Sequence, residues 1–226
     1  MTSRIFMSRS ACVAALLALG ACSSSPKPSD WQLEAKSAMD RAVTAYMEGN
    51  TRVEALEFGR ARSEISSTGR TDLLARAELL RCAGRVASLV FEPCAGFERL
   101  RQDAPAAERA YADYLAGRLQ PQDSALLPAP QRAVAASSGE AATVKNIGDP
   151  LSQLVAAAVV FQSGRASPAV LQQAVDTASV QGWRRPLLAW LGVQAQLADK
   201  AGDTEEAARL RRRITLTHNP AMGDKP

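Results

Sequence analysis

The sequence predicts an all-α fold built as an array of antiparallel helix hairpins. Apolar residues recur at helical spacing along nearly the whole 226-residue chain. Ala, Leu, Arg, Gln and Glu, which have high helix propensity, dominate the composition. No segment alternates apolar and polar residues over the length of a strand. These three observations favour helices packed on helices, without a sheet.

Two helices are predicted at the start of the folded part. The first covers about 31–48, and Gly49 and Asn50 end it. The second starts at Thr51, whose hydroxyl and the Glu54 carboxylate have the spacing of a capping box. The apolar residues that this second helix is expected to bury are Leu56, Phe58, Ala61 and Ile65.

Two more helices are predicted before residue 120. Thr71 is expected to cap the third helix, and Pro93 stops it. Pro105 lies where the fourth begins, and Gly117 ends that helix. The range 31–119 is therefore predicted to form an N-terminal helical lobe.

The composition changes over 120–149, where prolines and a Ser-Ser-Gly cluster predict an irregular connection of short helical turns. Helices resume at Asp149 and again at Ser167, because each is a capping residue followed by proline at the first helical position. A C-terminal helical lobe over 150–217 is predicted, followed by a frayed tail over 218–226.

Two turns of the chain have similar sequences. Gly-Asn-Thr at 49–51 matches Gly-Asp-Thr at 202–204, and each lies between two amphipathic segments. This resembles the turn between the paired helices of tetratricopeptide repeats, over 31–66 and 183–216. Such repeats have a period of roughly 34 residues, which the chain does not sustain. The expectation is thus either a tetratricopeptide-like solenoid or an irregular helical bundle.

The first 22 residues carry a different pattern. Arg4 and Arg9 precede an apolar run over 11–19, which Leu19-Gly20-Ala21-Cys22 closes. The run is too short for a transmembrane helix, which needs roughly 20 apolar residues. These features resemble the lipobox signal of bacterial lipoprotein precursors.

The lipoprotein resemblance implies that residues 1–21 are a signal peptide, starting at either Met1 or Met7. It also implies that Cys22 becomes the first residue and carries S-diacylglycerol and N-acyl groups, which anchor the protein to a membrane. The alternative is an ordinary secretory signal, cut near Ala21, in which Cys22 is incidental.

The residues after Cys22 complete the resemblance. In lipoproteins of Gram-negative bacteria, an Asp directly after the acylated cysteine retains the protein at the inner membrane. This chain has Ser23 at that position. The implied location is the periplasmic face of the outer membrane. The range 22–30, rich in Ser and Pro, is expected to be a tether between the membrane and the helices.

Two cysteines remain after such processing, Cys82 and Cys94. An even pair in an oxidising compartment favours a disulfide, and the helix breaker Pro93 lets the chain double back between them. Their spacing is not C-x-x-C, which argues against a redox-active pair. Two free buried thiols, or redox or metal chemistry, are the alternatives.

The charge balance gives no indication of a nucleic-acid partner. The chain has 27 basic residues and 23 acidic ones, and two of the basic residues, Arg4 and Arg9, leave with the signal peptide. The remaining 25 basic residues nearly balance the 23 acidic ones. No cofactor is expected, and no small-molecule ligand.

Catalytic motifs are absent from the sequence. The single histidine, His218, lies in the predicted tail, so a serine or cysteine nucleophile would have no base on the folded body. No zinc motif occurs, and no metal site is predicted. A carboxylate mechanism would need a buried glutamate in a cleft, for which Glu78, Glu98 and Glu108 are candidates. Arginines close to them in sequence favour solvated charges instead, namely Arg81, Arg101 and Arg109.

One surface patch is predicted from basic and aromatic residues. Its members are Trp183, Arg184, Arg185, Arg209, Arg211, Arg212 and Arg213. If the last two helices pack antiparallel, these side chains could receive lipid phosphates or an acidic protein surface. The alternative is that the cations lie near helix C-termini and their stems cover the core.

The combination resembles helical-repeat lipoproteins, including secretion pilotins and components of outer-membrane biogenesis. It implies a lipid-anchored, periplasm-facing interaction protein, an accessory subunit of an envelope assembly or secretion system with an envelope protein as partner. No enzyme activity is expected. A peptidoglycan-acting enzyme with a lone carboxylate and a lipid-binding carrier are the alternatives.

Overall fold

The computed structural model describes residues 28–137 and 139–218. Within these ranges the chain forms eleven α-helices and one 3-10 helix and has no strand, which confirms the all-α prediction. The predicted signal peptide, Cys22 and most of the predicted tether fall outside these ranges, as does the chain beyond His218.

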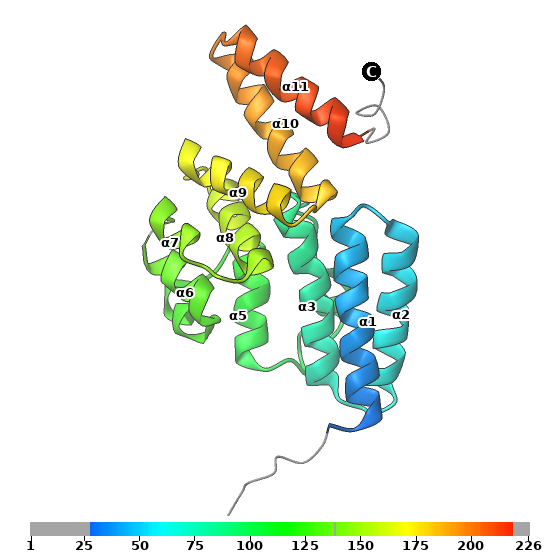
Figure 1. Cartoon of the computed structure of the whole chain (residues 1–226). Coiled ribbons are helices and arrows are strands. Elements are labelled where there is room, and N and C mark those ends of the chain that lie inside the picture. Colours follow the sequence, from blue (N-terminus) through cyan, green and yellow to red (C-terminus); the bar gives the residue numbers. More distant parts are fainter. Residues whose placement is uncertain (1–27, 138, 219–226) are drawn as a thin grey trace, which may run out of the picture.

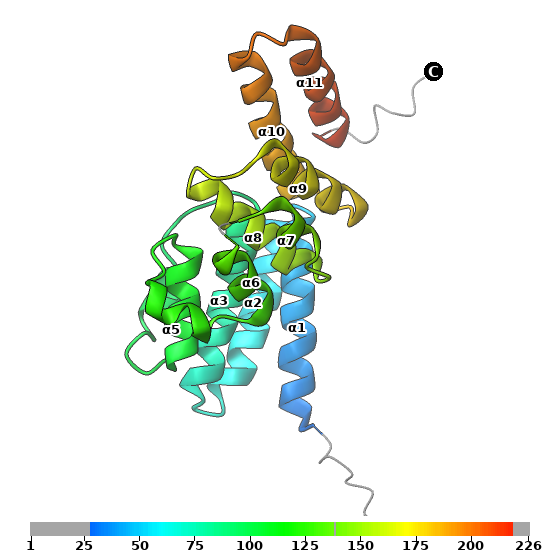
Figure 2. The same ribbon diagram turned by 90° about the vertical axis from the view of Figure 1, so that its left-hand side faces the viewer.

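Several helices stand side by side as a layer, and the last two helices form a hairpin that projects beyond it (Figure 1). The bounds of the helices are α1 (Asp30–Met47), α2 (Thr51–Ser66), α3 (Thr71–Ala87), α4 (Ala95–Glu98), α5 (Ala106–Leu115), η1 (Pro121–Leu126), α6 (Ala129–Ala136), α7 (Ala141–Lys145), α8 (Pro150–Gln162), α9 (Pro168–Val180), α10 (Arg184–Lys200) and α11 (Thr204–His218). In Figure 1, α5, α3, α1 and α2 stand side by side, and α9 runs above α5 and α3. The α10–α11 hairpin projects beyond α9 in both views, at the end opposite to the start of α1 (Figures 1 and 2).

The two turns with similar sequences adopt the same local structure. Gly49 and Gly202 both have left-handed backbones, with φ of +89° and +75°. In each turn the next side chain accepts a hydrogen bond from the third amide of the following helix. Asn50 accepts from the Val53 amide at 3.2 Å, and Asp203 accepts from the Glu206 amide at 2.9 Å.

The predicted capping box at Thr51 and Glu54 is wrong. Asn50 is the capping residue of α2, and Thr51 is already its first helical residue. The Glu54 side chain is buried against α3 and does not return to the cap. The prediction of Thr71 as a cap fails in the same way, because Arg70 holds the capping position of α3.

The buried face of α2 also differs from the prediction at one position. Phe58, Ala61 and Ile65 are buried, but Leu56 is 55% exposed. The buried face instead continues through Glu54, four residues before Phe58, and through Glu57, four residues before Ala61. Charged residues therefore occupy part of the interface of α2.

Helix α3 ends earlier than Pro93 predicts. Its last residue is Ala87, and Leu89 then takes a left-handed backbone with φ of +61°, which is uncommon for a residue other than glycine. The chain turns back through the short helix α4, which begins after Cys94.

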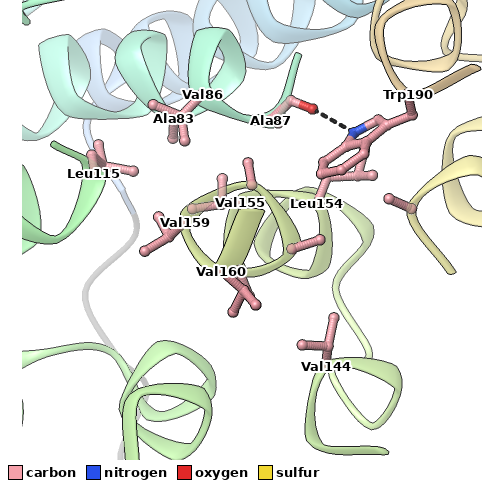
Figure 3. Close-up of a cluster of buried hydrophobic side chains, with 14 of the residues drawn as sticks. Ala83, Val86, Ala87, Leu115, Val144, Leu154, Val155, Val159, Val160 and Trp190 are labelled. Atoms are coloured by element: carbon pink, nitrogen blue, oxygen red, sulfur yellow. Dashed lines mark hydrogen bonds between the residues drawn. The ribbon is translucent and has the colours of Figure 1, made fainter. Parts of the chain in front are cut away.

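The main hydrophobic core runs through both predicted lobes. It extends from Met47 through α3, α5 and α8 to Leu210, and it includes Leu127 and Val144 from the predicted irregular connection. Trp190 lies fully buried in this core, and its indole Nε1 donates to the Ala87 carbonyl (Figure 3). A second, smaller core joins α1, α2 and α3.

The 120–149 connection consists of η1, α6 and α7 joined by non-helical chain, in agreement with the short turns predicted from its composition. The predicted caps at Asp149 and Ser167 are confirmed, since each accepts a hydrogen bond from an amide of the helix that follows. Of the helices seen in the described ranges, none combines the length and apolarity needed to cross a membrane.

Candidate functional site

Buried glutamates are the main chemical feature of the N-terminal helices. Three of them lie on α2 and α3, and each pairs with an arginine of a neighbouring helix. Glu54 accepts from Arg81 Nε at 2.6 Å, Glu57 from Arg41 Nε at 2.8 Å, and Glu78 from Arg62 Nη1 at 2.6 Å. Such pairs tie helices together, because removing one partner leaves an uncompensated buried charge.

The interpretation of Glu78 as a solvated charge paired with Arg81 is therefore wrong. Glu78 is buried and pairs across to α2, while Arg81 pairs with Glu54. Only Glu98 behaves as its spacing predicts. It is exposed and accepts from Arg101 Nε at 2.7 Å, and this hydrogen bond lowers the pKa of Glu98.

Glu108 differs from the other buried glutamates because one of its oxygens has no partner. Its side chain is only 9% exposed, and Oε1 accepts a hydrogen bond from Arg76 Nε of α3. The buried Oε2 atom accepts no hydrogen bond from any described residue. The expected partner Arg109 instead donates to the Ala104 carbonyl. Glu108 thus presents an acceptor that a ligand or partner could satisfy.

Two adjoining cavities flank Glu108 and Arg76. The first, of about 480 Å³, lies between α1 and α3 and is lined by Trp31, Ala35, Met39, Leu73, Ala77 and Leu80, among others. The second, of about 350 Å³, lies between α3, α5 and the end of η1, with Leu79, Glu108, Tyr111 and Leu127 in its wall. Arg76 and Leu80 line both cavities. We call the combined surface the α3 groove.

The α3 groove lies beside the point at which the predicted tether joins the helices. Trp31 is in the first turn of α1, immediately after the range 22–30. The start of α1 lies at the end of the molecule opposite to the α10–α11 hairpin (Figure 1).

The first part of the predicted basic patch lies against the end of α1. Arg185 Nε donates to the Tyr46 carbonyl at 2.7 Å, and Arg184 Nη2 donates to the Glu48 carbonyl at 2.8 Å. The Arg185 guanidinium also covers the Tyr46 ring, with 4.3 Å from Cζ to the ring centroid. Both cations thus satisfy carbonyls at the C-terminus of a helix, but that helix is α1 and not their own. Trp183 is partly buried against the main core.

The second part of the predicted patch lies on the projecting hairpin. Arg209 pairs with Glu206, and Arg211 pairs with Asp199 near the end of α10. Arg212 is exposed and Arg213 is partly buried. Arg209 and Arg211 thus pair within the α10–α11 hairpin, whereas Arg184 and Arg185 bind the end of α1. Arg211 lies beside the far end of α10, where α11 begins.

The predicted disulfide is confirmed in the structure. Cys82 of α3 and Cys94 are bonded, and their Cα atoms are 5.9 Å apart. The bond holds the start of α4 against α3. As to metals, no three His, Cys, Asp or Glu side chains in the described part of the chain lie together as a set of ligands.

Comparison with known proteins found no similarity. No protein-family model matches the chain, and neither a curated protein nor a solved structure matches it.

Sequence reasoning missed the pairing of Arg76 with Glu108. The two residues are 32 positions apart, and no local spacing predicts that they meet. The α3 groove was missed for the same reason, because its walls come from helices that are distant in sequence.

Proposed function

We propose that this protein is a lipid-anchored, periplasm-facing interaction protein, an accessory subunit of an envelope assembly or secretion system. The α3 groove is its docking site, and the occupant is an amphipathic helix of an envelope protein. The observation that supports this proposal is the unpartnered Oε2 atom of Glu108, which lies in a mostly apolar wall of the groove.

The chemistry of the groove defines the partner. Its walls of Leu80, Met39 and Leu127 favour the apolar face of a helix. The Oε2 atom of Glu108 favours a Lys or Arg on that same face, because such a side chain supplies the missing hydrogen-bond donor. The docked helix is thus expected to carry one basic residue among its apolar anchors.

The lipobox resemblance supports placing the groove near a membrane. Trp31, which lines the groove, is nine positions after Cys22, and an extended chain of nine steps spans at most roughly 30 Å. A partner that is itself associated with the same membrane would lie within this distance.

The experiment combines crosslinking with a measured affinity. A photocrosslinking residue at Lys36, on the groove, should give a specific product, whereas the same probe at Arg60 on α2 should not. The partner segment identified in this way is then titrated against purified variants. Leu80→Asp and Glu108→Gln should each weaken binding at least tenfold.

The matched control is Leu56→Asp, because Leu56 is an exposed leucine on α2 outside the groove. It should leave the affinity unchanged. A helix that binds Leu80→Asp as tightly as the unchanged protein would refute the groove as the docking site.

One observation favours a second candidate, the peptidoglycan-acting enzyme. Glu108 is a buried carboxylate at a cavity, which is the kind of group that such a mechanism needs. Its pairing with Arg76 supports the interaction role instead. A muropeptide-release assay separates the two, since release that disappears in Glu108→Gln would replace our proposal with the enzyme.

A further inference from the structure

A separate cavity of about 390 Å³ lies at the C-terminal end of α5, between α5, η1, α6 and α8. Most of its wall is apolar and includes Leu119, Val134, Val159 and Val160. In Figure 3, Val160 points away from α3 on the side of α8 opposite to Val155. The volume is in the range of pockets that hold small organic ligands. We call it the α5–α8 cavity.

The hydroxyl of Tyr114 has no hydrogen-bond partner in the described structure. Tyr114 lines the α5–α8 cavity, and only 3% of the residue is exposed. Its oxygen atom is fully buried and unpaired. A buried hydroxyl without a partner is uncommon in folded proteins and costs free energy unless a ligand or water satisfies it.

The charged residues that line the α5–α8 cavity are both cations. They are Arg132 of α6 and Arg165, which follows α8, and no carboxylate is among the described residues of the wall. Arg132 Nη1 donates to the Ala125 carbonyl at 3.2 Å, and Arg165 Nε donates to Ser163 Oγ at 2.9 Å. These two bonds hold the guanidinium groups at the edge of an apolar space.

Arg165 acts electrostatically on the unpaired hydroxyl. Burial raises the pKa of Tyr114, a charged Tyr111 would raise it further, and the positive charge of Arg165 opposes both effects. The hydroxyl therefore stays protonated at neutral pH and serves as a donor, and Arg165 lines the same cavity. A donor and a cation together form a site for a negatively charged oxygen.

We infer that the α5–α8 cavity binds a small amphiphilic carboxylate, with its head on the Tyr114 hydroxyl and the two arginines and its hydrocarbon body against the valines. This inference goes beyond the proposed partner docking and depends neither on the α3 groove nor on acylation of Cys22. It departs from the sequence-based expectation that no small-molecule ligand binds.

The test measures binding by calorimetry to the full chain carrying Cys22→Ala, which can be purified without detergent. Three probes separate the features of the ligand. Octanoate carries both the carboxylate and the hydrocarbon body, 1-octanol lacks the charge, and inorganic phosphate lacks the body. Octanoate should bind at least tenfold more tightly than either of the other two.

Variants of the cavity test the assignment of each group. Tyr114→Phe removes only the hydroxyl and should weaken octanoate binding roughly tenfold. Its melting temperature should not fall, because the hydroxyl makes no bond within the protein. Arg132→Gln should also weaken binding. Arg209→Gln on α11, whose guanidinium pairs with Glu206 away from the cavity, should have no effect.

Several results would overturn the inference. Equal binding of 1-octanol would show an apolar pocket without anion recognition, and equal binding of phosphate would show an anion site without a hydrocarbon pocket. Unchanged octanoate affinity in Tyr114→Phe would remove the hydroxyl from the site. Absence of octanoate binding to the unchanged cavity would refute it altogether.

Discussion

The indole Nε1 of Trp190 donates a hydrogen bond to the carbonyl of Ala87 at 3.1 Å, although the two residues are 103 positions apart. Ala87 is the last residue of α3, and Trp190 lies in the first half of α10. The ring also meets Phe161 of α8 edge-on, with 5.7 Å between centroids. This one side chain therefore connects three helices of the main core.

Removal of Trp190 should destabilise the whole fold. We expect Trp190→Ala to lower the free energy of unfolding by about 3–5 kcal/mol, because it leaves a large cavity. Trp190→Phe should cost about 1–3 kcal/mol, since it leaves the buried Ala87 carbonyl without its donor. Urea unfolding measures both. Leu216→Ala on the exposed side of α11 is the control and should stay within about 0.5 kcal/mol.

Arg185 should contribute to the attachment of α10 to α1. Arg185→Gln loses the hydrogen bond to the Tyr46 carbonyl and the contact with its ring, so the free energy of unfolding should fall by about 1–2 kcal/mol. The exposed Arg212 provides the control, and Arg212→Gln should be nearly neutral. Equal effects of the two substitutions in urea unfolding would argue against this attachment.

The disulfide should be detectable directly and should stabilise the fold. Peptide mapping without reductant should recover Cys82 and Cys94 in linked peptides, which separate on reduction. Breaking the bond by Cys94→Ser should cost about 2–3 kcal/mol, as the chain-entropy model gives for a loop of this length. Recovery of both cysteines as free thiols from the unreduced protein would contradict the assignment.

Glu98 should contribute to the dependence of stability on pH. Its pKa is lowered in the folded state, chiefly by the hydrogen bond from Arg101. The contribution is therefore present above the ordinary glutamate pKa of about 4.3 and is lost as the pH falls through the lower folded value. Melting temperatures measured between neutral and acid pH should fall less steeply in Glu98→Gln. Identical acid profiles for the variant and the unchanged protein would be inconsistent with this role.

Lipid attachment at Cys22 is expected from the lipobox resemblance. Labelling of cells with radioactive palmitate should mark the unchanged protein and should disappear in Cys22→Ala. Cys12→Ala, within the same signal segment, is the matched control and should keep the label. Persistent labelling of Cys22→Ala would exclude lipidation at this cysteine.

Much of the helix pattern could be predicted because it depends on neighbours in sequence. Asp149 and Ser167 cap helices through amides three residues ahead, and the turn at Gly49 needs only a residue that tolerates positive φ. The error at Thr51 is also local, since the adjacent Asn50 is an equally good cap and takes the position.

The candidate sites could not be predicted in this way. Nearness in sequence assigned Arg109 to Glu108 and Arg81 to Glu78, but the side chains pair with Arg76 and Arg62 of other helices. A sequence spacing of three or four residues shows which partner is near along one helix. It does not show which face of that helix another helix will cover.

By itself the sequence determined the all-α class, most helix ends and the pairing of Cys82 with Cys94. Helix propensity, capping and a short disulfide loop each involve about a dozen neighbouring residues or fewer, so their effects can be predicted from the sequence. Only the tertiary structure decided that Glu108 keeps an unpaired oxygen in the α3 groove and that Tyr114 keeps an unpaired hydroxyl in the α5–α8 cavity. Both depend on how helices distant in sequence are rotated and packed, since burial removes water from a polar atom without always supplying a new partner.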